Sequence, residues 1–314
     1  MKRIYVIIPC YNEKENLLHL NRKLQEVFKT KLNNNYNFRI LFVNDGSDDG
    51  TLEEIKGLQK IDSNIDFISF SRNFGHQQAI KAGIDHVNAD AVITMDADLQ
   101  HPPELIPEFI KFWEEGYEII NSKNSYRKNQ SAFKKMTSKG FYTLQNILSD
   151  VKIESGTADF RLIDKKVLEQ LRKLNEQNLF LRGAIPWIGF KQYTFEYFPG
   201  ERMYGQTKYT IRKMFGLAIA GITSFSIKPL RISIYFGLIF SAMAVVYLLY
   251  ALYIGLFTDK AIQGWTSVIV SVLFIGGLQL LMLGIIGEYL GKLFLENKKR
   301  PNYIIEQMKI SNEN

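Results

Sequence analysis

The sequence has a single cysteine, Cys10, among its 314 residues. One cysteine excludes an internal disulfide and a zinc site built from several cysteines. The chain also lacks a block of lysines and arginines with interleaved aromatic residues, although its formal net charge is +7. A basic chain without such a block favours anionic lipids or small anionic substrates, and we expect no nucleic-acid partner.

No secretory signal is visible at the N-terminus, because the apolar run at residues 4–8 is too short for the core of a signal peptide. We therefore expect the N-terminal part to stay in the cytoplasm. The sequence also shows no internal repeats and no low-complexity segments. Its length suffices for one large domain or two ordinary ones.

Charged residues are absent from two long apolar runs near the C-terminus, residues 232–257 and 265–287. Each run exceeds the roughly 20 residues that a helix needs to cross a bilayer core of about 30 Å. The connector between them is short, so the two runs predict a transmembrane hairpin. Lysines and arginines gather before the first run and after the second, while the connector carries only Lys260. By the positive-inside rule, both ends of the hairpin lie in the cytoplasm.

Ahead of the hairpin, apolar residues recur at helical spacing between residues 210 and 228, together with three cations. This pattern is typical of a helix that lies in a membrane interface. The expected organisation is therefore a cytoplasmic domain (1–209), an interfacial region (210–230), a two-helix membrane segment (231–295) and a cytoplasmic C-terminal tail (296–314).

The first half of the chain alternates short apolar strands with amphipathic helices. The expected strands are residues 4–8, 38–43, 65–70 and 91–95, with further strands at 117–121 and 191–198. This alternation predicts an α/β domain with a parallel sheet and helices on both faces. Ligands bind beyond the carboxyl ends of strands in such sheets. Polar clusters follow each of the first four strands, which favours a nucleotide-type site there.

Asp96 and Asp98 directly follow the strand at residues 91–95. Mg²⁺ and Mn²⁺ take oxygen ligands and often share them with a substrate phosphate. An Asp-x-Asp alone is a weak signal, because acidic pairs are common in turns. Two unpaired carboxylates at a strand end, however, repel each other unless a cation lies between them. The position therefore favours a divalent metal site.

Four motifs occur in order: PCYNE at residues 9–13, NDGS at 44–47, SRNFG at 71–75 and DADLQ at 96–100. With DFRL at 159–162 and the two apolar runs, they make the sequence similar to glycosyltransferase family 2 over essentially its whole length. It resembles the dolichol-phosphate-mannose-synthase-like branch, and most closely the bacterial bactoprenol (undecaprenyl phosphate) glucosyltransferases. The resemblance implies a GT-A fold, which is Rossmann-like, followed by interfacial helices and a transmembrane hairpin. His101 and Ala158 depart from the residues that are common in relatives.

The resemblance also implies roles for individual residues. Asp98 is expected to bind Mg²⁺ or Mn²⁺, Asp96 to bind the metal or the ribose-phosphate region, and Gln100 to be a further oxygen ligand. His76 and His101 lack metal-ligand spacing and are not expected to bind metal. The residues expected around the base and ribose are Pro9, Tyr11, Glu13 and Asp45. For Glu13, turn and helix-cap chemistry is an open alternative.

Asp159 matches the catalytic or acceptor-site aspartate of the family, just ahead of a short expected strand. A phosphate monoester has a second pKa of about 6, so the acceptor oxygen is already anionic and needs no base. Asp159 is then expected to orient the acceptor or to stabilise positive charge at the sugar carbon. Candidates for binding the lipid phosphate are Arg127, Arg202 and Lys208. Attraction to the membrane surface is their alternative role.

The resemblance implies an inverting transfer of a sugar onto undecaprenyl phosphate at the bacterial cytoplasmic membrane. Glucose from UDP-glucose is the first expectation for the sugar and its donor. N-acetylglucosamine, galactose and mannose stay open as sugars. Relatives imply a homo-oligomer, with a tetramer as one arrangement. A processive polysaccharide synthase would carry a Gln-x-x-Arg-Trp motif and more spans, and the sequence has neither. A catalytically idle membrane scaffold that binds nucleotide sugars is the remaining alternative.

Overall fold

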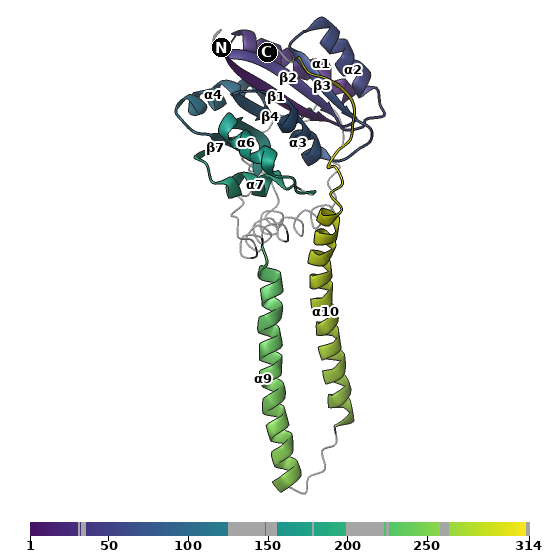
Figure 1. Cartoon of the computed structure of the whole chain (residues 1–314). Helices are drawn as coiled ribbons and strands as arrows, with labels where there is room; N and C mark the ends of the chain where they lie inside the picture. Colours follow the sequence, from purple (N-terminus) through teal and green to yellow (C-terminus); the bar gives the residue numbers. More distant parts are fainter. Residues whose placement is uncertain are drawn as a thin grey trace.

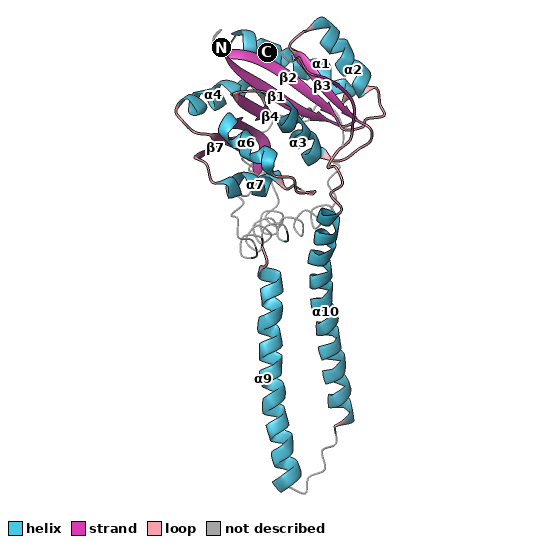
Figure 2. Cartoon of the chain, viewed as in Figure 1, coloured by secondary structure: helices cyan, strands magenta, loops and turns pink. Residues whose placement is uncertain are grey.

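An eight-stranded sheet organises the N-terminal part of the chain, with strand order β7-β5-β6-β4-β1-β2-β3-β8 (Figures 1 and 2). The computed structural model describes residues 1–30, 32, 36–124, 148, 156–177, 179–198, 223, 226–257 and 264–311. The strands are β1 (Lys2–Cys10), β2 (Tyr36–Asn44), β3 (Ile65–Phe70), β4 (Ala91–Thr94), β5 (Ile119–Asn124), β6 (Thr157–Asp164), β7 (Gln192–Tyr197) and β8 (Ile305–Lys309). The described helices are α1 (Lys14–Thr30), α2 (Thr51–Ile61), α3 (His76–His86), η1 (Pro103–Leu105), α4 (Ile106–Glu114), α6 (Lys165–Lys173), α7 (Leu181–Ile188), α9 (Lys228–Phe257) and α10 (Trp265–Asn297).

The sheet is mixed, which corrects the expectation of a parallel sheet. The central strands β4, β1, β2 and β3 are parallel, as predicted. β6 runs antiparallel to both β4 and β5, and β8 runs antiparallel to β3. The predicted polar clusters therefore still meet at one edge, because the four strands that precede them point the same way.

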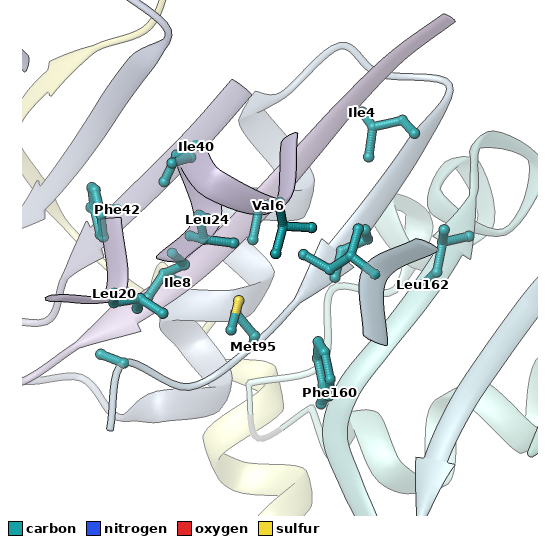
Figure 3. Packing of buried hydrophobic residues seen from close by; sticks show 14 of the residues in the cluster. Ile4, Val6, Ile8, Leu20, Leu24, Ile40, Phe42, Met95, Phe160 and Leu162 are labelled. Atoms are coloured by element: carbon teal, nitrogen blue, oxygen red, sulfur yellow. The ribbon is translucent and has the colours of Figure 1, made fainter. Parts of the chain in front are cut away.

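Two hydrophobic clusters cover the two faces of the sheet, because successive side chains of a strand point to opposite faces. On β1, Ile4, Val6 and Ile8 face a cluster that includes Leu20 and Leu24 of α1 (Figure 3). Tyr5 and Ile7 belong to the opposite cluster, which includes residues of α3, α6 and α7. The same strands thus bury both faces, as their unbroken apolar sequences predict.

The two apolar runs form the long helices α9 and α10, which extend side by side away from the sheet (Figure 1). Within them, Lys228–Tyr247 and Phe274–Asn297 are long and apolar enough to cross a membrane, and neither segment is buried against the rest of the chain. Most of the interfacial region expected at residues 210–230 lies outside the described residues.

The segment after α10 returns to the sheet, whereas the sequence indicated only a tail at 296–314. β8 pairs with β3 and becomes the edge strand of the sheet. Ahead of it, Tyr303 stacks on Phe70 at 5.2 Å between ring centroids. Asn302 donates a hydrogen bond from Nδ2 to the backbone oxygen of Glu176 at 3.1 Å. The hairpin is therefore followed by a segment that belongs structurally to the N-terminal domain.

Candidate active site

The loops after β2 and β3 are held together by Asp45. Its carboxylate accepts hydrogen bonds from the backbone N–H groups of Phe74 at 2.6 Å and Gly75 at 2.9 Å. Burial raises the pKa of Asp45, and the two N–H donors partly offset this effect. Next to it, Gly46 has φ +64°, and an added Cβ would lie 2.3 Å from the carbonyl carbon of Arg72. The two loops thus meet at backbone contact, which only glycine permits.

The loop after β1 joins the same assembly through Asn12. The backbone N–H of Asn12 donates to Ser47 Oγ at 3.0 Å, and Asn12 Oδ1 accepts from the backbone N–H of Asp48 at 3.1 Å. Asn12 has φ +56°, in the left-handed region, so it does not cap α1 in the usual extended conformation. Its side chain instead ties the first two loops together.

The Asp-x-Asp turn starts directly after β4. Leu99 adopts φ +63° while its side chain stays in the core, with 5% of its surface exposed. A leucine in the left-handed region is uncommon and stays there only when its surroundings fix it. The turn is closed by the backbone N–H of Gln100, which donates to Asp98 Oδ1 at 3.1 Å. Asp98 is therefore buried and oriented by its own turn.

Two histidines contact Asp96. His76, the first residue of α3, lies 2.8 Å from Asp96 Oδ1 through Nε2, and the Nε2 atom of His101 lies 3.7 Å from Asp96 Oδ2. Desolvation opposes charge on both partners of the closer pair, although 42% of the His76 side chain and 36% of the Asp96 side chain are exposed. Asp96 nevertheless raises the pKa of His76 to about 9, and Asp159 adds to this shift. His101 and His76 lower the pKa of Asp96 to about 2. Both shifts favour a charged pair of His76 and Asp96.

Asp159 lies inside β6, rather than ahead of a strand as expected, because the strand begins at Thr157 directly after Gly156 at φ +83°. Its carboxylate accepts two hydrogen bonds from Arg182, from Nη2 to Oδ2 at 2.8 Å and from Nε to Oδ1 at 3.1 Å. Arg161 donates from Nη2 to Oδ1 at 3.2 Å. Although burial opposes the charge, Arg182 and then Arg161 hold the pKa of Asp159 well below its usual range.

Asp159 and Asp96 are neighbours across β6 and β4. Thr94, the last residue of β4, donates from Oγ1 to the backbone oxygen of Asp159 at 2.5 Å. His76 bridges the two carboxylates, since its Nδ1 lies 4.0 Å from Asp159 Oδ2. Gln77 donates to the same oxygen at 3.4 Å and accepts from the backbone N–H of Leu181 at 3.2 Å. The N-terminus of α3 therefore joins both acidic positions to α7.

The donor set fits a hard divalent cation that shares its ligands with a substrate. The predicted ligands Asp96 and Asp98 could supply carboxylate oxygens, and the third predicted ligand, Gln100, could add an amide oxygen from the same turn. Among the described residues, no group of three or more His, Cys, Asp or Glu side chains is arranged to hold a metal. Two carboxylates and one amide oxygen would leave the remaining positions of a six-coordinate ion to water or phosphate oxygens, and Mg²⁺ is commonly bound next to phosphates in this way.

The sequence profile of Glycosyl transferase family 2 matches residues 5–172, more than half of the chain. This chain belongs to glycosyl transferase family 2. It is a glycosyltransferase, and its mixed Rossmann-like sheet is the GT-A fold, as the motifs implied. A second profile, the GtrB C-terminal hairpin, matches residues 228–293 and so covers α9 and most of α10.

Curated relatives match this glycosyltransferase over nearly its full length. The uncharacterized glycosyltransferase YkcC of Bacillus subtilis (strain 168) is 45% identical over 303 residues, 96% of this chain and 93% of the relative. A prophage bactoprenol glucosyl transferase homolog of Escherichia coli (strain K12) is 39% identical, over 98% of this chain and 99% of the relative. The bactoprenol glucosyl transferase of Shigella phage SfV is 38% identical, with coverage of 98% and 99%. The similarity includes the hairpin.

The predicted nucleotide-binding residues of this glycosyltransferase lie at the end of β1 and on the loops that Asp45 and Asn12 join. Pro9 is buried in β1, and Tyr11, with 39% of its surface exposed, follows that strand. Glu13 accepts a hydrogen bond from Asn16 Nδ2 at 2.6 Å, so it takes part in the helix-start chemistry that was its alternative role. Contact of these residues with a nucleotide stays a prediction.

The structure also brings residues to the site that the sequence did not predict. His76, Gln77 and Arg182 all contact Asp159 or Asp96, although no role in the site was predicted for any of them. The position of His76, directly after the SRNFG motif and at the same edge of the sheet as Asp96, is the signal that could have indicated it. The three predicted lipid-phosphate candidates, Arg127, Arg202 and Lys208, lie outside the described residues.

Proposed function

We propose that this glycosyltransferase moves a hexose, glucose from UDP-glucose in the first place, onto a polyprenyl phosphate such as undecaprenyl phosphate. The observation that carries the proposal is one chain that joins a family 2 domain to the hairpin profile at residues 228–293. Relatives named bactoprenol glucosyl transferase match both parts together. An acceptor that stays in the bilayer gives a physical reason for this combination, since the catalytic domain must then be held at the membrane.

In the proposed arrangement, α9 and α10 cross the bacterial cytoplasmic membrane, and the sheet lies on the cytoplasmic side. β1 and β8 belong to one sheet, so residues 2–10 and 305–309 lie on the same side as the catalytic domain. Lys228 and Arg231 at the start of α9, and residues 298–300 after α10, agree with the positive-inside rule. Assembly into a homo-oligomer is part of the proposal and rests on the resemblance alone.

The reaction is a direct displacement at the anomeric carbon. An oxygen of the lipid phosphate forms the new bond on the face opposite the nucleotide, and the bond to the departing diphosphate breaks with its electron pair. The product is a sugar of inverted configuration, linked to the lipid through phosphate. When bound at Asp96, Asp98 and Gln100, Mg²⁺ or Mn²⁺ supplies positive charge for the diphosphate. Residues 9–13 and Asp45 form the loops on which the base and ribose bind.

The role proposed for Asp159 is to orient the acceptor site rather than to remove a proton. Its oxygens accept hydrogen bonds from Arg161, Arg182 and Gln77, and its pKa lies well below the usual range. An efficient general base has a pKa near the operating pH, and Asp159 does not. The acceptor phosphate needs no base in any case, because it is already anionic at neutral pH.

The test is transfer of radiolabel from UDP-glucose into organic-extractable lipid by the purified full-length protein with undecaprenyl phosphate and Mg²⁺ or Mn²⁺. Label in the lipid is expected, and we expect Asp98→Asn or chelator to reduce it at least about 100-fold. Glu53→Gln, on the exposed surface of α2, is the matched control that keeps activity. Transfer from another nucleotide sugar, without transfer from UDP-glucose, would show that the donor differs from the one proposed. Failure with every donor would favour the idle scaffold, and a retained anomeric configuration would contradict direct displacement.

A further inference from the structure

The imidazole of His101 closes the turn that carries Asp96 and Asp98. The backbone N–H of Asp96 donates a hydrogen bond to His101 Nδ1 at 2.9 Å. Because a backbone N–H can only donate, Nδ1 is the acceptor in this contact. The other ring nitrogen, Nε2, lies 3.7 Å from Asp96 Oδ2, which is too long for a hydrogen bond. The histidine therefore holds the main chain of Asp96 rather than its carboxylate.

The ring of His101 is itself fixed by aromatic neighbours. It is buried and stacks on Phe160, with 5.1 Å between the ring centroids and 11° between the ring planes. The ring of Tyr197 meets it at 6.2 Å and 68°. Phe160 belongs to the hydrophobic cluster that also contains Met95, the residue before Asp96 (Figure 3). Packing on this scale locks a side chain in one orientation, so Nδ1 stays directed at the main chain of Asp96.

The same stack joins the Asp-x-Asp turn to β6. Phe160 directly follows Asp159 in this strand, and β6 pairs with β4, the strand that leads into the turn. His101 thus contacts the turn through its nitrogen and β6 through its ring face. One side chain therefore sets where Asp96 lies relative to the strand that carries Asp159.

The turn needs such a contact at its start. Its second half is fixed by the hydrogen bond from the backbone of Gln100 to Asp98 Oδ1. Between the two ends, Leu99 adopts φ +63°, and a leucine keeps this conformation only where its surroundings impose it. The bond to His101 fixes the first half of the turn. Hydrogen bonds from residues that do not touch a metal commonly orient its ligands in this way.

We propose that His101 is a positioning residue of the metal site. Its Nδ1 holds the backbone of Asp96 so that Asp96 and Asp98 present their carboxylates from one fixed turn. The inference rests on the proposed function, because it needs a divalent cation at this turn. The spacing of His101 in the sequence argued against a metal ligand, and the structure gives it a different task. What the site requires of this residue is an acceptor atom at the position of Nδ1.

The test measures the Kd of the full-length protein for Mn²⁺ in the presence of UDP, from the electron paramagnetic resonance signal of free Mn²⁺. No acceptor lipid and no turnover are needed. His101→Phe keeps a planar ring against Phe160 but has no acceptor, and it is expected to raise the Kd for Mn²⁺ at least about tenfold. An unchanged Kd in His101→Phe would overturn the proposal, even if the variant unfolded at a lower temperature.

Two amide variants separate positioning from packing. Asparagine carries its Oδ1 as many bonds from Cα as histidine carries Nδ1, whereas the Oε1 of glutamine corresponds to Nε2. His101→Asn is therefore expected to bind Mn²⁺ within about threefold of the wild-type protein, and His101→Gln at least about tenfold more weakly. Both variants lose the stack on Phe160, so a packing role predicts equal losses. Equal Kd values for the two would overturn the proposal, and this comparison also decides the question if His101→Phe does not fold.

His86→Phe is the matched control. His86 is the last residue of α3, where its Nδ1 lies 2.9 Å from the backbone oxygen of Ala82 and its ring packs against Tyr303. This change also replaces a hydrogen-bonded imidazole by a phenyl ring, but at the end of α3 remote from Asp96. The Kd for Mn²⁺ is expected to change less than about twofold.

Failure of the proposed function gives a different result. A wild-type protein that binds Mn²⁺, shows the expected order of variants and transfers no sugar to lipid would support the role of His101 and contradict the function. A wild-type protein that binds no Mn²⁺ in the presence of UDP would overturn the role of His101 together with the metal site.

Discussion

The phenol of Tyr303 donates a hydrogen bond to Asp85 Oδ2 at 3.0 Å, although 218 positions separate the two residues. Asp85 lies near the end of α3, the helix whose first residue is His76. The segment that follows α10 in the sequence is thus attached to a helix whose first residue lies in the active site.

Tyr303→Phe is expected to lower the free energy of unfolding by about 1 kcal/mol, because it removes this hydrogen bond and keeps the ring on Phe70. Tyr303→Ala, which also removes the ring, is expected to cost about 3 kcal/mol. Denaturant unfolding of the full-length protein measures both values. Tyr36→Phe is the control, since it removes an exposed hydrogen bond to Glu114 and should cost under about 0.5 kcal/mol. If the two variants Tyr303→Phe and Tyr36→Phe lowered the free energy of unfolding equally, the result would contradict a stabilising hydrogen bond between Tyr303 and Asp85.

Gly46→Ala is expected to weaken donor binding and to destabilise the protein by about 2 kcal/mol or more. The new Cβ would meet the backbone of Arg72, and the left-handed backbone would be strained. Gly57→Ala is a suitable comparison, because a Cβ there meets nothing within 4 Å in the middle of α2. That change should stabilise the protein by about 0.5–1 kcal/mol. Thermal unfolding and titration with UDP-glucose measure the two effects, and similar outcomes for both variants would refute the loop contact.

Asp159→Asn is expected to reduce the transfer rate about 100-fold while leaving the shape of the pH profile unchanged between pH 5 and 8. The wild-type carboxylate stays ionised throughout this window, because Arg182 and Arg161 hold its pKa far below it. The measurement is the pH dependence of kcat/KM for both proteins. A wild-type profile with an acidic limb that disappears in the variant would show that Asp159 acts as a base.

The raised pKa of Glu176 leads to a prediction of how the stability of the fold depends on pH. Burial, and then the negative charge of Glu296, raise the pKa of Glu176 above its ordinary 4.5. A raised pKa means that the folded state binds the proton more tightly, so Glu176 destabilises the fold above its folded pKa. This destabilisation fades as the pH falls through that value toward 4.5. Glu176→Gln is expected to be more stable than the wild-type protein at pH 7, with the difference vanishing near pH 4. Unfolding temperatures across this range check the sign, and a variant less stable at pH 7 would contradict it.

The strands that bury both faces could be predicted from sequence because their apolar runs are continuous and their ends are marked by polar motifs. β1 to β4 were predicted within two residues of their observed ends for this reason. The carboxylates at Asp96 and Asp98 were located by the same logic, since residues after parallel strands converge. The local sequence pattern was therefore sufficient to predict the central strands of the sheet and the turn that carries Asp96 and Asp98.

What could not be predicted depends on pairing between distant segments. β6 and β8 run antiparallel to their neighbours, and strand direction is set by tertiary contacts that a local pattern does not carry. The charged residues of β8, such as Glu306 and Lys309, resemble those of a solvated tail because one edge of this strand stays exposed. Arg182 lies 23 positions after Asp159, and no spacing rule joins a strand residue to the start of a later helix.

The pairing of β8 with β3 has a consequence for biosynthesis. The ribosome produces β3 early and β8 only after both helices of the hairpin. Until then the outer edge of β3 has unpaired backbone groups, and such an edge invites pairing with other chains. The nascent domain therefore completes its sheet only once the hairpin has been made. A fragment that stops before α9 would keep this edge open permanently, and aggregation during expression is its expected fate.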